Sequence, residues 1–310
     1  MKEIKKVLIC GIGAVGSIYA NKINEFDREN LRVLVDKKRL ENYTKNPKIF
    51  NGKPLNLNYI LPEDNNFQAD LIIIATKFDG LLEAVENIKN FVKKDTIIMS
   101  LLNGVTSEEI IAQKYGWENV PLAYFIGHSA MRDGNNITYD GIGDIVFGVK
   151  NSQQTNVEII ELIKKYFDKA GIDYKTPENM YRAYWIKYML NVSSNQPSAI
   201  LKMTFGQMQD NKKFVEFMKK VMTEVQMIAK AEGVQDSETM IDEALVSFNK
   251  MIKNGKTSML QDVEAKRLTE VKMFAGAMIK FGEKHSISTP YNMVMKDMIE
   301  IIHENYNFEK

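Results

Sequence analysis

The chain has 310 residues, of which 45% are hydrophobic and 26% charged, and its 41 basic and 40 acidic side chains leave a net charge of +1. This balance is typical of a folded globular protein of one large or two ordinary domains, and it argues against long disorder and collagen or coiled-coil arrays. Nucleic-acid binders and polybasic membrane binders normally carry a surplus of positive charge, so neither class is favoured.

The chain contains one cysteine, Cys10, so no disulfide can form within it. Its first residues run directly into a strand-like segment, and we expect no secretory signal there. The longest apolar runs, 71–75 and 97–102, are too short to cross a bilayer. We therefore expect a soluble protein of the cytoplasm.

The first half of the chain alternates apolar, β-branched runs with helical stretches. Strands are predicted at 7–10, 31–35, 71–75 and 96–100, and helices at 14–25, 80–92 and 157–170. Continuous apolar strands that alternate with helices predict a parallel, doubly wound sheet. Between residues 124 and 149, frequent glycines separate short β-like pieces, which predict antiparallel strands, and 171–177 predicts a last short strand.

After Pro177 the strand signals nearly vanish. Helices are predicted at 180–194, 212–232, 237–253, 259–284 and 291–304. The sequence therefore predicts two domains. We expect residues 1–176 to form an α/β domain, and residues 177–310 to form an all-helical domain.

A glycine-rich turn follows the first predicted strand and opens the first helix. It consists of Gly11, Ile12, Gly13, Ala14, Val15 and Gly16, which is the pattern G-x-G-x-x-G. In this context Gly11 permits a tight turn, Gly13 lets the backbone approach a pyrophosphate, and Gly16 lets the helix pack close to the strand. The alternative is a strand–helix turn without a ligand. The strand, turn and helix stand in the expected order, so we expect residues 1–176 to be a Rossmann-type dinucleotide-binding domain.

Two polar side chains follow predicted strands, at the edge of the sheet where such folds bind ligands. Lys77 comes after the strand at 71–75, and Asn103 comes after the strand at 96–100. A lysine there can bind phosphate or ribose, and an asparagine can bind a nicotinamide or a substrate. The alternatives are a solvated lysine and a turn former before Gly104.

A polar stripe lies on the helix predicted at 180–194. Lys187, Asn191 and Asn195 are spaced four residues apart, which places them on one narrow face among apolar neighbours. Burying such a stripe is unfavourable unless it meets a polar ligand. The alternative is that it forms the solvated face of an amphipathic helix.

A second polar cluster spans residues 257–262 and continues with Arg267, Thr269 and Glu270. Ser258 and Gln261 fit a capping box, so Ser258 is predicted to cap the next helix, a position that can also bind a carboxylate. Glu270 by itself fits a surface carboxylate. The three histidines show no spacing typical of a metal site, and no P-loop or nucleophile elbow is present.

Together these motifs resemble the 2-dehydropantoate 2-reductases, also called ketopantoate reductases, in order and over most of the chain. The resemblance rests on the glycine turn at 11–16, Lys77, Asn103-Gly104, the segment His128-Ser129-Ala130, the helix with Trp185, Lys187, Asn191 and Asn195, and the cluster of 257–262 with Arg267, Thr269 and Glu270. The last two motifs are specific to that family.

The resemblance implies an NAD(P)H-dependent oxidoreductase that reduces 2-dehydropantoate to (R)-pantoate in pantothenate and coenzyme A biosynthesis. It implies that Lys187 donates the proton, that Glu270 acts beside it and the cofactor, and that Asn103 touches both substrate and nicotinamide. The substrate-binding residues that it implies are Asn191, Asn195 and Ser258, and the cofactor-binding residues are those of the glycine turn with Lys77, Asn103, Ala130 and Glu270. It also implies a homodimer through the helical half and no metal.

Two other functions stay open from the sequence. One is a reductase of the same fold that acts on another 2-oxo acid. The other is a non-catalytic nicotinamide sensor, which would have no need of Lys187. Two departures from the family, Gln196 between Asn195 and Pro197 and Phe205 in place of an asparagine, bear on the far end of the substrate.

The choice between NAD and NADP depends on Asp36, which follows the second predicted strand. Most of the resembling family carries an arginine there, which suits the 2′-phosphate of NADP. An aspartate favours the free ribose hydroxyls of NAD. The basic run Lys37-Lys38-Arg39 could still hold a phosphate, and Asp36 could simply cap the following helix. We expect Asp36 to favour NAD.

Overall fold

The structure is a computed structural model that describes residues 3–127, 130–150 and 155–306. The chain folds into two compact units. The first comprises Met1–Leu102 and Ser107–Tyr181, and the second comprises Asn103–Thr106 and Arg182–Lys310. The division follows Tyr181, where the sequence placed it at residue 176. The short segment Asn103–Thr106 belongs to the second unit although it follows a strand of the first.

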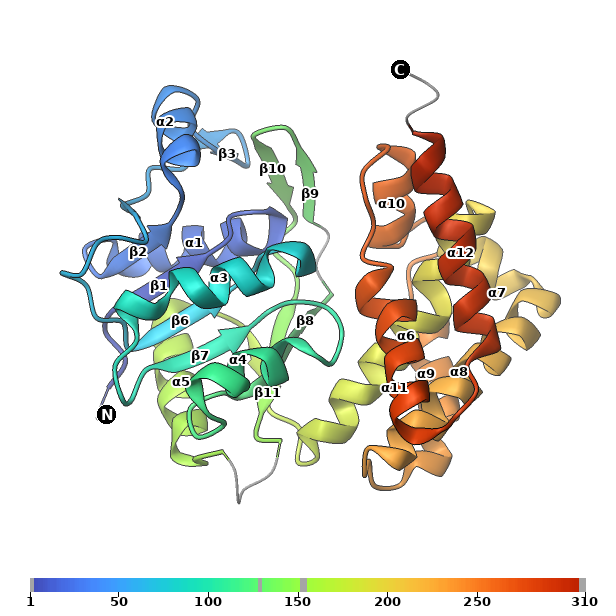
Figure 1. Cartoon of the computed structure of the whole chain (residues 1–310). Helices are drawn as coiled ribbons and strands as arrows, with labels where there is room; N and C mark the ends of the chain where they lie inside the picture. Colours follow the sequence, from blue (N-terminus) through green and yellow to red (C-terminus); the bar gives the residue numbers. More distant parts are fainter. Residues whose placement is uncertain (1–2, 128–129, 151–154, 307–310) are drawn as a thin grey trace. The chain divides into compact units, whose positions relative to one another are not determined.

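The first unit is built on a parallel sheet in the strand order β5-β2-β1-β6-β7 (Figure 1). Its strands are β1 (Val7–Cys10), β2 (Leu31–Leu34), β5 (Tyr59–Ile60), β6 (Leu71–Ile74) and β7 (Ile97–Ser100). Every residue of β1, β6 and β7 is buried, as expected for strands covered on both faces. The predicted parallel, doubly wound sheet is therefore confirmed.

The helices of this unit alternate with its strands. They are α1 (Ala14–Asp27), α2 (Lys37–Lys45), α3 (Leu81–Asn87), α4 (Ser107–Tyr115) and α5 (Glu158–Ala170), with 3₁₀ turns η1 (Phe78–Gly80) and η2 (Lys89–Phe91). β1 pairs with β2 on one side and β6 on the other, so the strand order reverses at β1. In such sheets ligands bind beyond the carboxyl ends of the strands at this reversal.

Two small sheets complete the first unit, in the strand orders β4-β3-β10-β9 and β12-β11-β8. Their strands are β3 (Ile49–Phe50), β4 (Lys53–Pro54), β8 (Leu122–Ile126), β9 (Ala130–Asp133), β10 (Asn136–Tyr139), β11 (Asp144–Gly148) and β12 (Tyr174–Lys175). The antiparallel strands predicted between 124 and 149 are present, because β8 pairs with β11 and β9 with β10.

The second unit is helical throughout the residues that the structure describes (Figure 1). Its elements are α6 (Met180–Leu201), α7 (Phe205–Asp210), α8 (Lys212–Ala231), η3 (Ser237–Thr239), α9 (Met240–Asn249), α10 (Ser258–Glu264), the π-helix η4 (Lys272–Gly276), α11 (Ala277–His285) and α12 (Pro290–Asn305). The predicted all-helical second domain is confirmed. Among the described residues, no helix is both long and apolar enough to cross a membrane.

Two predicted helices in this unit differ from the structure in where they end. The helix predicted at 180–194 continues through Pro197 to Leu201, within a stretch of α6 that is buried on nearly every face. The single helix predicted at 259–284 is interrupted after Glu264, where Lys266 adopts a left-handed backbone with φ +50°. The Nε of Arg267 then folds back onto Asp262 Oδ1 at 2.7 Å. Glu270 lies in this interruption and leads into the π-helix.

Candidate functional site

The glycine turn connects β1 to α1 and has little room for side chains. Gly11 has φ +96°, and a Cβ there would lie 2.8 Å from the backbone of Ala75 and Thr76. A Cβ on Gly16 would lie 1.9 Å from the carbonyl oxygen of Gly11. Both positions therefore require glycine. Gly13 differs, because a Cβ there would meet nothing within 4 Å.

These features fit the pyrophosphate of a dinucleotide. Gly13 is the N-cap of α1 and provides no side-chain cap for the first amides of the helix. Two residues beyond the adjacent strand β6, the Oγ1 of Thr76 is buried and has no hydrogen-bond partner among the residues that the structure describes. Within the turn Ile12 is buried, and Ala14 and Val15 are half-buried. Uncapped helix amides beside a buried hydroxyl suit a phosphate oxygen.

Asp36 stands at the end of β2 and caps α2. Its Oδ1 accepts a hydrogen bond from the backbone N–H of Arg39 at 2.6 Å, and its Oδ2 lies 3.0 Å from Nη1 of the same residue. The alternative considered for Asp36, that it caps the following helix, is therefore correct as far as the cap is concerned. The carboxylate and the guanidinium lie together at the strand end where this fold reads the adenosine ribose.

The other predicted cofactor residues of the first unit lie at strand ends. Lys77 is exposed and precedes η1, directly after β6. Ala130 is half-buried and opens β9. His128 and Ser129 lie outside the described residues.

The polar stripe of α6 is largely buried. Asn191 is 6% exposed and Asn195 is 7% exposed, so the stripe is not the solvated face of an amphipathic helix. Lys187 is half-buried, and burial lowers its pKa to about 8. An ammonium with this pKa is mostly charged at neutral pH and can still release its proton.

Asn103, Asn191 and Glu270 come together in the second unit. The Nδ2 of Asn103 donates to Oε2 of Glu270 at 3.1 Å, and its Oδ1 lies 3.5 Å from Nδ2 of Asn191. The adjacent Gly104 has φ +98°, and a Cβ there would lie 2.5 Å from Cγ of Met273. This close approach holds the Asn103-Gly104 turn against η4, so the Asn103 amide is fixed between α6 and Glu270.

Ser258 does not cap α10, and that prediction is wrong. The cap is Thr257, whose Oγ1 accepts from the backbone N–H of Leu260 at 3.1 Å and donates to Oγ of Ser198 at the same distance. Thr257 also has a side-chain hydroxyl and stands one residue before Ser258, and α10 begins at Ser258. The cap therefore lies one residue earlier than predicted. The hydroxyl-bearing Ser258 is exposed and makes no hydrogen bond to another predicted site residue in the described chain.

Sequence analysis missed several residues that shape this site. Thr76 was passed over beside Lys77, although its place at a strand end was visible. Tyr188 and Gln196 each follow a residue of the polar stripe, and both bind the backbone of η4. Of these two, only Gln196 carried a signal in the sequence, as a departure from the family pattern.

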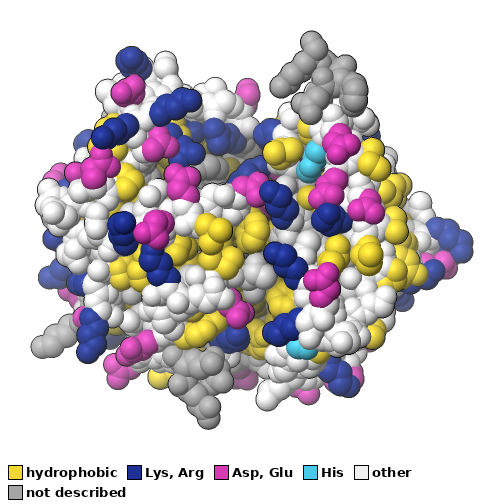
Figure 2. Space-filling model, in the orientation of Figure 1, with side chains coloured by type: hydrophobic (Ala, Val, Ile, Leu, Met, Phe, Trp, Pro, Cys, Tyr) yellow, Lys and Arg dark blue, Asp and Glu magenta, His cyan; other side chains and the backbone are white. Residues whose placement is uncertain are grey.

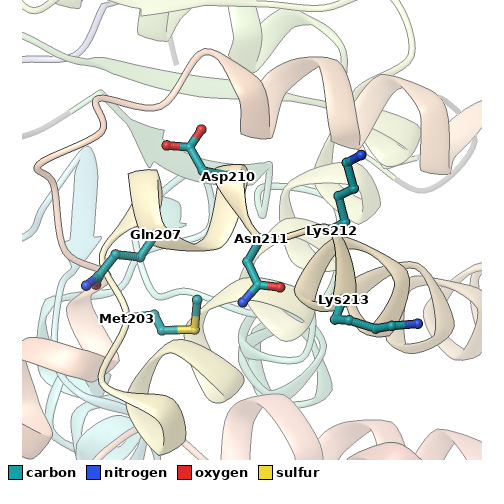
Figure 3. Close-up of a pocket in the computed structure, with 6 residues that line it drawn as sticks. All are labelled: Met203, Gln207, Asp210, Asn211, Lys212 and Lys213. Atoms are coloured by element: carbon teal, nitrogen blue, oxygen red, sulfur yellow. The ribbon is translucent and has the colours of Figure 1, made fainter.

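An open depression of about 580 Å³ lies elsewhere in the second unit, at the junction of α7 and α8 (Figure 3). It is lined by Met203, Gln207, Asp210, Asn211, Lys212 and Lys213. None of these is a predicted site residue. In Figure 3 the charged ends of Asp210, Lys212 and Lys213 point in different directions and converge on no common point. In residues 3–127, 130–150 and 155–306, no group of three or more His, Cys, Asp or Glu side chains could hold a metal ion.

Comparison with known proteins assigns the family. The family Ketopantoate reductase PanE/ApbA matches residues 7–152, and its C-terminal counterpart matches residues 179–303. A 2-dehydropantoate 2-reductase of Aquifex aeolicus (strain VF5) is 26% identical over 303 residues, which cover 96% of each chain.

Two solved structures share the fold. D-mandelate dehydrogenase, in a ternary structure with NADH and anilino(oxo)acetate, has a TM-score of 0.85 at 22% identity and covers 97% of this chain and 99% of that one. A dimeric ketopantoate reductase from Staphylococcus aureus has a TM-score of 0.76 at 21% identity, with the same coverage. Because the two family matches span both units, and include the glycine turn and the Lys187 helix, the chain belongs to the ketopantoate reductase family of NAD(P)H-binding oxidoreductases.

Proposed function

We propose that this protein reduces 2-dehydropantoate (ketopantoate) to (R)-pantoate with NAD(P)H, as a step of pantothenate and coenzyme A biosynthesis. The observation that carries the proposal is Lys187, a half-buried ammonium on the same helix face as two buried asparagines. A protein that only sensed nicotinamide would have no use for a lysine whose pKa burial lowers to about 8.

When bound, NAD(P)H would supply a hydride to the ketone carbon. As the C=O double bond breaks, its electron pair moves to oxygen. In our proposal the Lys187 ammonium donates a hydrogen bond to this oxygen and then transfers its proton, which completes the alcohol and leaves a neutral amine. A donor with a pKa of about 8 is well matched to this transfer near neutral pH.

Asn103 and Glu270 orient the reacting groups in this scheme. The carboxylate of Glu270 accepts a hydrogen bond from Nδ2 of Asn103. This bond fixes the orientation of the Asn103 amide toward the substrate. We assign Asn191, Asn195 and Ser258 to the polar groups of the 2-oxo acid. The substrate carboxylate needs N–H and O–H donors, and these three side chains supply them.

The cofactor is assigned to the first unit. The uncapped amides at the start of α1 and the buried hydroxyl of Thr76 would hold the pyrophosphate, with Lys77 and Ala130 on adjacent strand ends. Asp36 is assigned to the ribose, and we propose that it favours NAD over NADP.

Turnover tests the proposal directly. Loss of NADH or NADPH absorbance is measured with ketopantoate and with a panel of branched and aromatic 2-oxo acids. We expect the highest kcat/KM with ketopantoate. Cofactor binding without turnover of any 2-oxo acid would contradict the proposal and support a sensor.

A second candidate is reduction of a different 2-oxo acid. It is favoured by the likeness to D-mandelate dehydrogenase and by Phe205, which stands where the family usually carries an asparagine. The phenyl ring of Phe205 cannot hydrogen-bond a substrate as an asparagine side chain could. It packs edge-on against Phe248. A higher kcat/KM for an aromatic 2-oxo acid than for ketopantoate would select this candidate.

We also propose that the protein is a homodimer and that it works in the cytoplasm. The first proposal draws on the dimeric family member from Staphylococcus aureus. The second draws on the single cysteine, Cys10, which is buried and whose pKa burial raises to about 12, because a chain without disulfides suits a reducing compartment.

A further inference from the structure

The π-helix η4 begins two residues after Glu270 and leaves a backbone amide to be satisfied from outside. The carbonyl of Val271 would normally accept from Ala275, four residues on, but here it accepts from Gly276 at 3.0 Å. The N–H of Ala275 donates instead to Oε1 of Gln196, on α6, at 3.0 Å. A π-turn is uncommon and typical of functional sites.

Gln196 is held in place by a buried polar chain. Its Nε2 donates to Oδ1 of Asn292 at 3.2 Å and to the carbonyl of Val192 at 3.0 Å. The Nδ2 and the backbone N–H of Asn292 both donate to Oε2 of Glu224, at 2.7 and 3.2 Å. Gln196 and Asn292 are fully buried and Glu224 is 5% exposed, so no water competes for these bonds.

A second contact from α6 holds the other side of the same turn. The hydroxyl of Tyr188 lies 3.2 Å from the carbonyl oxygen of Met273 and 3.0 Å from that of Phe274, and it donates to this pair. Tyr188 directly follows Lys187, and Gln196 directly follows Asn195. The backbone of η4 is therefore bound at two points by the helix that carries the proposed proton donor.

We infer that Gln196 is a positioning residue of this enzyme, which holds the π-turn so that Glu270 and the Asn103-Gly104 turn keep their place beside Asn191, on the helix that carries Lys187. The π-turn contacts both partners, because the carbonyl of Glu270 accepts from the N–H of Met273 at 2.9 Å and Gly104 packs on the Met273 side chain. This inference rests on the proposed function, in which the Asn103–Glu270 pair serves the reaction.

The test replaces Gln196 by methionine, which keeps the volume and removes all three of these side-chain hydrogen bonds. We expect Gln196→Met to lower kcat about tenfold, with KM for NAD(P)H changed less than about twofold, since a displaced reacting group slows the chemical step more than it weakens binding. Gln209→Met is the matched control. Gln209 is a partly buried glutamine that bonds the carbonyls of Phe248 and Met251, away from η4, and kcat should be unchanged.

A double-mutant cycle separates positioning from a general structural role. If Gln196 acts through Glu270, then Gln196→Met should lower kcat by less than about twofold in a Glu270→Ala background. Additive effects of the two changes, or an unaltered kcat in Gln196→Met at equal folded fraction, would overturn the inference.

Hydrogen–deuterium exchange gives a readout that needs no activity. The peptide that covers residues 271–276 should exchange at least about tenfold faster in Gln196→Met than in the unaltered protein, because the Ala275 amide loses its acceptor. Should Gln196→Met not fold, the more distant and isosteric Glu224→Gln should raise the same exchange rate by a smaller factor. Unchanged exchange in the variant that folds overturns the inference. Faster exchange in a protein that turns over no 2-oxo acid would contradict the proposed function alone.

Discussion

The half-buried ammonium of Lys187 links a structural property to a measurable pH profile. Burial lowers its pKa from the ordinary value of 10.5 to about 8. The proton donor must be charged in the free enzyme, so kcat/KM for ketone reduction should be level below about pH 7. Above about pH 8 it should fall tenfold per pH unit. The measurement is initial velocity from pH 6 to 10 at low substrate concentration.

Two variants check that the lysine causes this fall. Lys187→Ala should lower turnover about 10²-fold or more, the scale of a lost general acid, while cofactor binding is retained. Lys187→Arg keeps the charge but does not titrate in this range. The remaining activity of this variant should therefore not fall above about pH 8. The same fall above about pH 8 in Lys187→Arg would assign the titration to another group.

Lys48 is a second lysine with a lowered pKa, and here the expected effect is on stability. Its side chain is fully buried, its Nζ has no hydrogen-bond partner among the described residues, and it lies 5.2 Å from the centre of the Tyr43 ring. Burial, with the nearby charge of Arg132, lowers its pKa to about 8. The folded state therefore binds this proton less tightly than the unfolded state does.

The sign of the pH dependence follows from that difference. Below about pH 8 Lys48 is charged in both states, and its buried charge lowers the free energy of unfolding by the full amount. This destabilisation is relieved as the pH rises toward about 10.4, the pKa of lysine in the unfolded chain. Between pH 7.5 and 9.5 the free energy of unfolding should rise about 2 kcal/mol more in the unaltered protein than in Lys48→Met. Urea unfolding at both pH values measures it. Lys53→Met, at an exposed position on β4, is the control and should keep the rise. A parallel pH dependence in Lys48→Met would contradict the prediction.

At the level of residues, the sequence predicts those features of the candidate site that depend on local geometry alone. The spacing of Lys187, Asn191 and Asn195 places them on one face, because the period of an α-helix is constant. The pairing of Asn103 with Glu270 joins residues 167 positions apart, so only tertiary structure brings it about. The burial of Lys48 is equally invisible in a chain so rich in lysine.

At the level of elements, the cap on α2 bears on the choice of cofactor. Asp36 accepts a hydrogen bond from the backbone of Arg39 and forms an ion pair with its guanidinium. The carboxylate therefore neutralises the positive charge of Arg39. Asp36→Ala should cost about 1 kcal/mol in stability through the lost cap. It should also raise kcat/KM for NADPH relative to NADH about tenfold, since Arg39 becomes available to a 2′-phosphate.

Asp36→Asn separates the cap from the charge. Asparagine caps helices as well as aspartate does, so stability should be kept while the preference still moves toward NADPH. The measurements are thermal unfolding and kcat/KM with each cofactor at fixed 2-oxo acid. A cofactor ratio that is the same in both variants and in the unaltered protein would show that Asp36 acts only as a cap.

Two other elements show where sequence patterns fail. Apolar residues recur through 259–284 as in one helix, yet the left-handed backbone of Lys266 ends α10 early and lets Glu270 enter the site. The π-turn of η4 is stabilised by side chains of Tyr188 and Gln196 on another helix. Helical periodicity carries no information on either event, because both depend on tertiary contacts.

At the level of the whole molecule, composition and pattern were enough for the architecture. Fully apolar strands such as 71–74 can only be covered on both faces, and this predicted the parallel sheet. The loss of strand signals after Pro177 predicted the helical unit. The division of the chain differs from the predicted one in two respects, of which the first is the boundary after Tyr181 in place of residue 176. The segment Asn103–Thr106 joins the helical unit, since Gly104 packs against Met273, and no composition shift marks it.

The proposed homodimer is argued from the surface of α12. Hydrophobic side chains gather over this helix in Figure 2, and the exposed ones are Met293, Val294, Met298 and Ile301. Val294, Met298 and Ile301 are spaced four and three residues apart, so they share a face opposite the buried Met295 and Ile299. An exposed apolar stripe of this kind is typical of an interaction surface, and we assign it to a second copy of the chain.

Sedimentation equilibrium measures the consequence. We expect the mass of a dimer for the unaltered protein, and a dissociation constant raised at least about 100-fold by the double change Met298→Glu and Ile301→Glu, because the paired stripes would bury four like charges. Ile252→Glu is the control, since Ile252 is 81% exposed and lies outside α12. It should leave the dimer intact. A monomeric mass for the unaltered protein at micromolar concentration would contradict the dimer, and equal weakening by Ile252→Glu would contradict the assignment to α12.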